Sequence, residues 1–273
     1  NLPGGFVVKG LSREPILGNP PPRVWEAESG MINSIGLQNV GVREFVARKL
    51  PSLRGLRSAV IANVFGYAEE DYLEVLRVLE DAEGLAAYEL NVSCPNTKHG
   101  GQFFSNDERM LGQLVERAKS VAARRPVMVK LSPNVASIPP LARAAEQAGA
   151  DMLSLINTVQ ALAIDARTRK PRIGAGFGGL SGPAVKPIAL RLVYEAARAV
   201  RIPVVGLGGI ATGEDAAEFL IAGATAIQVG TASFWDPGAV PRIVRELDRF
   251  LQQERIAQVS ELTGSLQFGD RRQ

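Results

Sequence analysis

The chain has 273 residues, of which 46% are hydrophobic and 6% aromatic, and its formal net charge at pH 7 is +3. The basic residues are scattered without interleaved aromatic residues, so the composition favours neither nucleic acid nor a membrane surface as a partner. A single cysteine excludes an internal disulfide, and it also excludes an iron–sulfur cluster or a thiolate zinc site built from this chain alone.

Short apolar strands alternate with amphipathic helices along the whole chain. We predict strands at 6–9, 58–63, 87–92, 127–131, 151–156, 203–207 and 226–229. The predicted helices cover 42–49, 69–81, a segment that starts with a capping box at 105–108, 141–148, 187–200, a segment capped by Thr212 and ended by Gly223, and 240–253. This order is typical of a parallel sheet. The glycine-rich stretch 159–186 is expected to be one long loop with a functional role or high mobility.

The number and the ends of the strands favour a barrel. Seven strands are counted, whereas a closed (β/α)8 TIM barrel has eight. The start of the chain resembles neither a signal peptide nor an initiator sequence, and no apolar run is long enough to span a membrane. We therefore expect a single α/β barrel domain over 1–273 whose first strand lies upstream of Asn1. A doubly wound sheet is the alternative, but it does not explain polar residues after nearly every strand.

These polar residues would meet at one mouth of the barrel, which is the active-site face of such folds. They are Lys9, Asn63, Asn91 with Cys94, Lys130, Asn157 with Thr158, Gly208 with Gly209, and Gly230 with Thr231. Glycines after the last two strands favour phosphate binding, because backbone N–H groups and a helix N-terminus can then approach the anion closely. The alternative is that these glycines only form the turns that enter helices.

Cys94 stands where a strand becomes a polar turn, within Asn91-Val92-Ser93-Cys94-Pro95-Asn96. A lone cysteine is more often an inert buried thiol, but amide and hydroxyl side chains around it make poor core material. Lys9 and Lys130 follow apolar strand residues directly, so we expect them to have little route to solvent.

Several motifs resemble the dihydroorotate dehydrogenase family. They are the Cys94 motif, Val129-Lys130-Leu131-Ser132-Pro133-Asn134, Ser154-Leu155-Ile156-Asn157-Thr158, Gly179-Leu180-Ser181-Gly182-Pro183, Met31-Ile32-Asn33-Ser34-Ile35-Gly36-Leu37-Gln38-Asn39 and Gly206-Leu207-Gly208-Gly209-Ile210. Cysteine at position 94 resembles class 1. Lys98-His99-Gly100-Gly101 and Gly36-Leu37-Gln38-Asn39 look most like subclass B, whose FMN-containing catalytic subunits work with a partner subunit that carries FAD and a 2Fe-2S cluster.

The resemblance implies oxidation of dihydroorotate to orotate in pyrimidine biosynthesis by a cytoplasmic enzyme. Cys94 would be the base that takes the C5 proton, and FMN would take the C6 hydride. The implied substrate-binding residues are Lys9, Asn33, Ser34, Ile35, Gly36, Leu37, Asn91, Asn96, Asn157 and Thr158. The implied cofactor-binding residues are Lys9, Gly10, Asn63, Asn91, Lys130, Ile156, Gly182, Gly208, Gly209, Gly230 and Thr231. No metal ligand is expected.

The resemblance also implies a homodimer that joins its partner subunits in a heterotetramer and passes electrons to NAD. Two other interpretations stay open. One is a related FMN barrel that acts on another dihydropyrimidine such as dihydrouracil, although Asn96 speaks against it. The other is a non-catalytic barrel that serves as a docking module.

Overall fold

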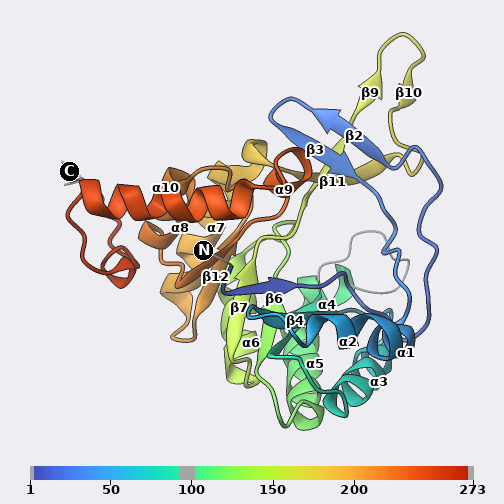
Figure 1. Ribbon diagram of the computed structural model, residues 1–273. Helices are drawn as coiled ribbons and strands as arrows, with labels where there is room; N and C mark the ends of the chain where they lie inside the picture. The colour runs from blue at the N-terminus through green and yellow to red at the C-terminus, as the bar shows by residue number, and fades with distance from the viewer. Residues whose placement is uncertain (1–2, 93–101, 270–273) are drawn as a thin grey trace.

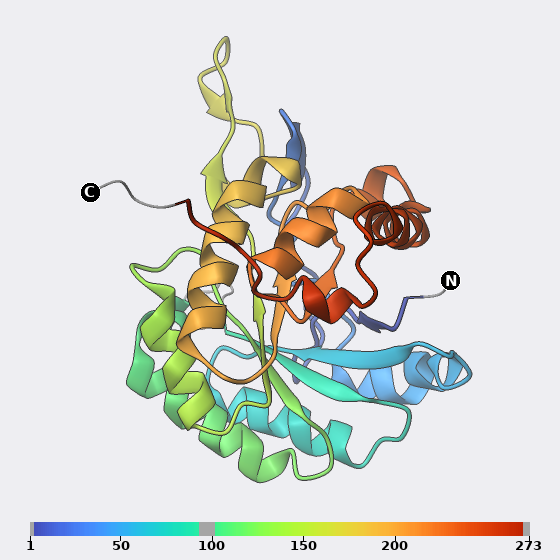
Figure 2. The same ribbon diagram turned by 90° about the vertical axis from the view of Figure 1, so that its left-hand side faces the viewer.

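The structure, a computed structural model, describes residues 3–92 and 102–269. Its centre is a curled sheet of seven parallel strands (Figure 1, Figure 2). In order across the sheet the strands are β1 (Gly5–Val7), β4 (Ala59–Val64), β5 (Ala87–Asn91), β6 (Val127–Lys130), β7 (Met152–Leu155), β12 (Val204–Leu207) and β13 (Ala226–Gln228). All seven predicted strands are therefore confirmed, with ends that differ by at most two residues.

Helices cover the outer face of the curled sheet (Figure 2). They are α1 (Val42–Glu44), the π-helical turn η1 (Phe45–Lys49), α2 (Leu50–Leu53), α3 (Glu69–Glu80), α4 (Gln102–Asn106), α5 (Glu108–Val121), α6 (Ile138–Gln147), α7 (Lys186–Ala199), α8 (Gly213–Ile221), α9 (Ala232–Trp235) and α10 (Ala239–Gln253), with 3-10 turns η2 (Pro183–Val185) and η3 (Val259–Glu261). Strands covered in this way read as continuous apolar runs, as the buried residues 127–129 of β6 illustrate. No helix in the described ranges is long and apolar enough to cross a membrane.

The sheet curls far enough for strands that are distant in its order to face each other. The amide of Gln228 on β13 contacts the carboxylate of Glu89 on β5 at 3.4 Å, although three strands separate them in the sheet. This contact across an interior distinguishes a barrel from a doubly wound sheet. Within the described residues β1 and β13 are the two edges of the sheet, and a closed barrel of this type has eight strands.

The prediction of one long loop over 159–186 was wrong. The segment carries β8 (Val159–Leu162), β9 (Ile164–Asp165), β10 (Lys170–Pro171) and β11 (Phe177–Ser181). β11 pairs with β8 and with β3 (Gly30–Asn33), which pairs with β2 (Val24–Ala27), so that a four-stranded antiparallel sheet forms beside the barrel (Figure 1). Glycine has a low strand propensity, so the glycine-rich composition of this segment gave no sign of strands.

The predicted starts of two helices had different outcomes. Thr212 caps α8, since its side chain accepts a hydrogen bond from the Asp215 backbone N–H at 3.1 Å. The capping box assigned to Ser105 was wrong. Ser105 is a buried residue of α4, and Asp107 caps α5 by accepting from the Met110 N–H at 2.9 Å. A short helix precedes the predicted one, and the cap therefore lies two residues later.

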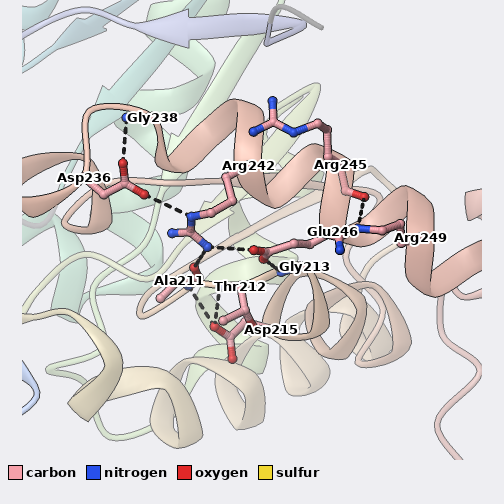
Figure 3. A network of polar contacts seen from close by, with 10 residues as sticks. All are labelled: Ala211, Thr212, Gly213, Asp215, Asp236, Gly238, Arg242, Arg245, Glu246 and Arg249. Carbon is pink, nitrogen blue, oxygen red and sulfur yellow. Dashed lines mark hydrogen bonds and ion pairs between the residues drawn. The ribbon is translucent and has the colours of Figure 1, made fainter.

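Helix α10 holds the start of α8 through one arginine (Figure 3). The Arg242 guanidinium donates to Asp236, to Glu246 and to the carbonyl of Ala211, at 3.0, 3.0 and 3.1 Å. The second carboxylate oxygen of Glu246 accepts from the Gly213 N–H, at 2.8 Å. Because α8 follows Gly208 and Gly209 closely in the chain, this network positions the loop that carries these two glycines.

A buried arginine holds the amino ends of the strands. Arg125 donates to the carbonyls of Ala82 and Leu85, at 2.5 and 3.0 Å, and to the Tyr88 hydroxyl, at 2.8 Å. Burial raises the pKa of Tyr88, and its hydrogen bond to Glu80 acts in the same direction. These contacts lie at the opposite end of the strands from the predicted site, and we assign them to stability.

Candidate functional site

A cavity of about 120 Å³ lies at the carboxyl ends of the strands, where the sequence predicts the mouth of the barrel. Its lining combines polar side chains with glycines from several loops. The lining residues are Lys130, Ile156, Asn157, Thr158, Leu180, Ser181, Gly182, Val185, Leu207, Gly208, Gly209, Gly230 and Thr231. The structure thus brings together most of the predicted cofactor-binding residues and two of the predicted substrate-binding residues.

Three of the lining glycines have backbone conformations that other residues rarely adopt. The φ angles of Gly182, Gly208 and Gly209 are +97°, +127° and +88°. A Cβ at Gly209 would lie 2.9 Å from the Gly182 carbonyl oxygen, whereas a Cβ at Gly230 would meet no atom within 4 Å. The loop that carries Gly182 therefore packs tightly against the loop that carries Gly209. The space beside Gly230 is open to a ligand.

The backbone N–H groups of these loops are available as donors. Within the described part of the chain, no hydrogen bond from the N–H of Gly208, Gly209 or Gly230 is found. Backbone N–H groups arranged around a cavity in this way can bind an anion such as phosphate. The nearest lysine of α7, Lys186, is neutralised by Asp215 and Glu218, at 2.6 and 2.7 Å, so backbone groups are the principal donors here.

On the other side of the cavity, Lys130 ends strand β6. Its side chain is 17% exposed, and its Nζ lies 3.7 Å from Oε1 of the buried Glu89. The same carboxylate accepts from Asn63 Nδ2 at 2.7 Å and from Ser154 Oγ at 2.8 Å. One carboxylate on β5 thus contacts residues of β4, β6 and β7, and Lys130 extends from this cluster into the cavity.

The amides at the ends of β5 and β7 contact each other directly. Asn157 Nδ2 donates to Asn91 Oδ1 at 3.1 Å, and Asn157 Oδ1 accepts from the Thr158 N–H at 2.8 Å. Asn134 supports this corner, since its amide donates to the Thr158 carbonyl at 3.0 Å and accepts from the Gln160 N–H at 2.9 Å. Asn134 therefore supports the residues that follow strand β7.

Asn33 and Thr158 lie on either side of strand β11. The Asn33 amide donates to the Gly179 carbonyl at 3.4 Å, and β3 pairs Asn33 with Gly179. A Cβ at Gly179 would overlap the Thr158 hydroxyl and lie 2.5 Å from Thr158 Cβ. Gly179 therefore allows two predicted substrate-binding residues, from the antiparallel sheet and from the barrel, to approach each other.

The loop 34–37 is held from behind by Asn19. Asn19 donates from its side chain to the Ser34 carbonyl at 2.8 Å and from its backbone to the Ile35 carbonyl at 3.0 Å. Gly36 and Leu37 have φ angles of +72° and +60°. Ser34 is fully buried, and its hydroxyl has no hydrogen-bond partner among the described residues. Asn19 therefore supports a loop that is predicted to bind the substrate.

Other predicted residues lie beside the cavity or outside the described residues. Asn63 is buried against Gly10, where an added Cβ would come within 2.8 Å of Asn63 Oδ1. Lys9 is exposed, contrary to the expectation that it has little route to solvent, because it follows an edge strand of the described sheet. Cys94 and Asn96 lie outside the described residues.

Sequence reasoning missed several residues of this site. Leu180, Ser181, Val185 and Leu207 line the cavity, and Glu89 holds its lysine. Glu89 had a detectable signal, since a carboxylate inside an otherwise apolar parallel strand must be buried and needs partners. The residues of β11 had none, because the strand itself was not predicted. No group of three or more histidine, cysteine, aspartate or glutamate residues in the described ranges could hold a metal ion.

Comparison with known proteins identifies the family. The family model described as dihydroorotate dehydrogenase matches residues 2–251. A protein of Solibacter usitatus, provisionally named a dihydroorotate dehydrogenase A (fumarate), is 72% identical over 98% of this chain and 88% of its own length. The dihydroorotate dehydrogenase B (NAD(+)) catalytic subunit of Geobacter sulfurreducens is 52% identical over 97% of this chain and 86% of its own length.

A solved structure supports the barrel fold. The crystal structure of the Eimeria tenella dihydroorotate dehydrogenase in complex with ferulenol matches 94% of this chain and 77% of its own chain, with a TM-score of 0.82 and 23% sequence identity. This match confirms the predicted (β/α)8 TIM barrel. Together with the family model and the sequence relatives, it leads to one conclusion: the chain belongs to the dihydroorotate dehydrogenase family of oxidoreductases.

Proposed function

We propose that this chain is one FMN-binding barrel that oxidises (S)-dihydroorotate to orotate in pyrimidine biosynthesis. The observation that carries the proposal is the cavity at the strand ends of a chain of this family. It combines a lysine, an amide and hydroxyl pair, and glycine loops whose N–H groups donate to no described residue.

The residues present fit FMN. Gly182, Gly208, Gly209, Gly230 and Thr231 would hold its phosphate end, because three of these glycines allow close approach and the N–H groups are available. Lys130, and Lys9, which follows β1, would lie at the polar edge of its ring, where a cation stabilises the reduced, anionic flavin. Gly10, Asn63 and Ile156 would support the ring. Bound FMN supplies the acceptor for the hydride that leaves C6 of the substrate.

The chain's own residues would bind the substrate and remove its second hydrogen. Asn33, Asn91, Asn96 and Asn157 with Thr158 would hold the pyrimidine, since neutral amides both donate to and accept from such a ring. The loop 34–37 would also contact it. The Cys94 thiolate would take the C5 proton as the C5–C6 double bond forms, and a base of this kind contributes about 10² to 10⁴-fold.

Anaerobic reconstitution tests the proposal. Purified protein supplied with FMN should be yellow, and dihydroorotate should bleach it, whereas dihydrouracil should bleach it far more slowly. A protein that takes up no FMN would contradict the proposal. Equal bleaching by dihydrouracil would favour the related reaction on another dihydropyrimidine, and FMN binding without any bleaching would favour a docking module.

The names of the relatives disagree on the electron acceptor, fumarate in one and NAD in the other. The motifs at 36–39 and 98–101 support subclass B. We therefore propose a cytoplasmic homodimer that forms a heterotetramer with a subunit carrying FAD and a 2Fe-2S cluster. Copurification of a cysteine-rich flavoprotein with NAD-dependent turnover is the expected result. Efficient turnover of fumarate by this chain alone would contradict the assignment to subclass B.

A further inference from the structure

Glu89 is a fully buried carboxylate directly behind the lysine of the cavity, and it does not itself line the cavity. Its Oε1 accepts a hydrogen bond from Asn63 at 2.7 Å, and its Oε2 accepts from Ser154 at 2.8 Å and from Gln228 at 3.4 Å. All three partners are neutral. A buried carboxylate also needs a cation, and Lys130 is the only described residue that forms an ion pair with it.

The geometry of this pair leaves the donors of Lys130 available. Its Nζ lies 3.7 Å from Glu89 Oε1, which is an ion-pair distance beyond hydrogen-bond range. No described residue accepts a hydrogen bond from Lys130, so its N–H groups can turn to a ligand in the cavity. Such a ligand can accept hydrogen bonds from the Lys130 ammonium group. The positive charge of Lys130 that acts on the ligand is partly offset by the negative charge of Glu89.

We propose that Glu89 is a positioning residue that weakens the field of Lys130 at the bound flavin. The inference rests on the proposed function. A buried lysine alone would strongly favour the reduced, anionic flavin. With Glu89 at 3.7 Å the site favours that state less, and electrons therefore leave the site for the next acceptor more readily. Glu89 would act through Lys130, without contact to the substrate.

The test compares the affinity of the apoprotein for oxidised and for dithionite-reduced FMN, under anaerobic conditions. Glu89→Gln removes the charge and keeps the shape of the side chain. We expect the ratio of reduced to oxidised affinity to rise about tenfold, because the Lys130 charge is no longer offset. In a Lys130→Gln background the same substitution should leave the ratio unchanged, because a carboxylate buried without its cation takes up a proton and then has no charge left to remove.

Ser154→Ala is the matched control. It removes a hydrogen bond to the same carboxylate but leaves the charge in place, so it should lower the thermal unfolding temperature without changing the ratio. An unchanged or lowered ratio in Glu89→Gln would overturn the inference, and so would an equal rise in the Lys130→Gln background.

If Glu89→Gln does not fold, Glu89→Asp carries the test. Its carboxylate is withdrawn by one methylene, and the ratio should rise by a smaller factor; an unchanged or lowered ratio would overturn the inference. Failure of the proposed function is a different result, namely wild-type protein that does not bind FMN or is not bleached by dihydroorotate.

Discussion

Gly230→Ala is the sharpest probe of the proposed phosphate site, because the structure separates its effect on binding from its effect on folding. An added Cβ meets no atom within 4 Å, and Gly230 does not have a positive φ. The change in the free energy of unfolding should therefore stay within about 0.5 kcal/mol. If a phosphate lies against this loop, the methyl group occupies its space, and FMN affinity should fall about 10- to 100-fold, or roughly 1.4 to 2.8 kcal/mol.

The assay is titration of the apoprotein by quenching of FMN fluorescence, together with thermal unfolding of the same preparations. Gly55→Ala is the matched control, since a Cβ there also meets nothing within 4 Å and Gly55 does not line the cavity. Gly208→Ala is the contrasting variant. Its φ of +127° and a Cβ 2.8 Å from Ala189 Cβ predict losses of both stability and binding. If Gly230→Ala binds FMN as tightly as Gly55→Ala, the phosphate site is placed wrongly.

Three further predictions follow from named contacts. Arg125→Met should lower the free energy of unfolding by about 2 to 4 kcal/mol in denaturant titrations, because buried carbonyls lose their donor, while FMN affinity stays unchanged. Burial alone would raise the pKa of Asp215, but hydrogen bonds from Lys186 and from the start of α8 outweigh it and hold the pKa below its usual value. The resulting stability is present above the unfolded pKa of about 3.9 and is lost as the pH falls through the folded pKa, so the stability difference between wild type and Asp215→Asn should shrink in acid unfolding curves below about pH 4. A difference that grows in acid would contradict this sign. Asn157→Ala removes the contact to Asn91 and should raise KM for dihydroorotate about tenfold or more in steady-state assays without weakening FMN binding; an unchanged KM would exclude Asn157 from the substrate site.

The barrel strands could be predicted because parallel strands covered on both faces leave a simple pattern. β6 is apolar up to Lys130, and the residue that breaks the pattern is the one that enters the cavity. The glycines after β12 and β13 were equally clear, because glycines at strand ends are typical of loops that allow an anion close to the backbone. Local rules were therefore sufficient for this side of the site.

The antiparallel sheet could not be predicted from local rules, because its strands are stabilised by partners far away in the chain. β11 pairs Gly179 with Asn33, which lies 146 residues earlier, and its glycines have low intrinsic strand propensity. The supporting roles of Asn19 and Asn134 could not be predicted for a related reason. Their side chains do form local structure, but they stabilise loops that carry site residues from other parts of the chain.

The most direct test of the central claim is the rate at which dihydroorotate bleaches the FMN-loaded protein, measured by anaerobic stopped-flow for wild type and for Cys94→Ser. A cysteine base has an ordinary pKa of about 8.5, whereas a serine hydroxyl ionises far less, so the substitution should slow bleaching, most strongly near neutral pH. FMN affinity should be the same in both proteins. Equal rates across the pH range would contradict the role of Cys94 as the base, and a wild-type protein that dihydroorotate does not bleach would contradict the proposed function itself.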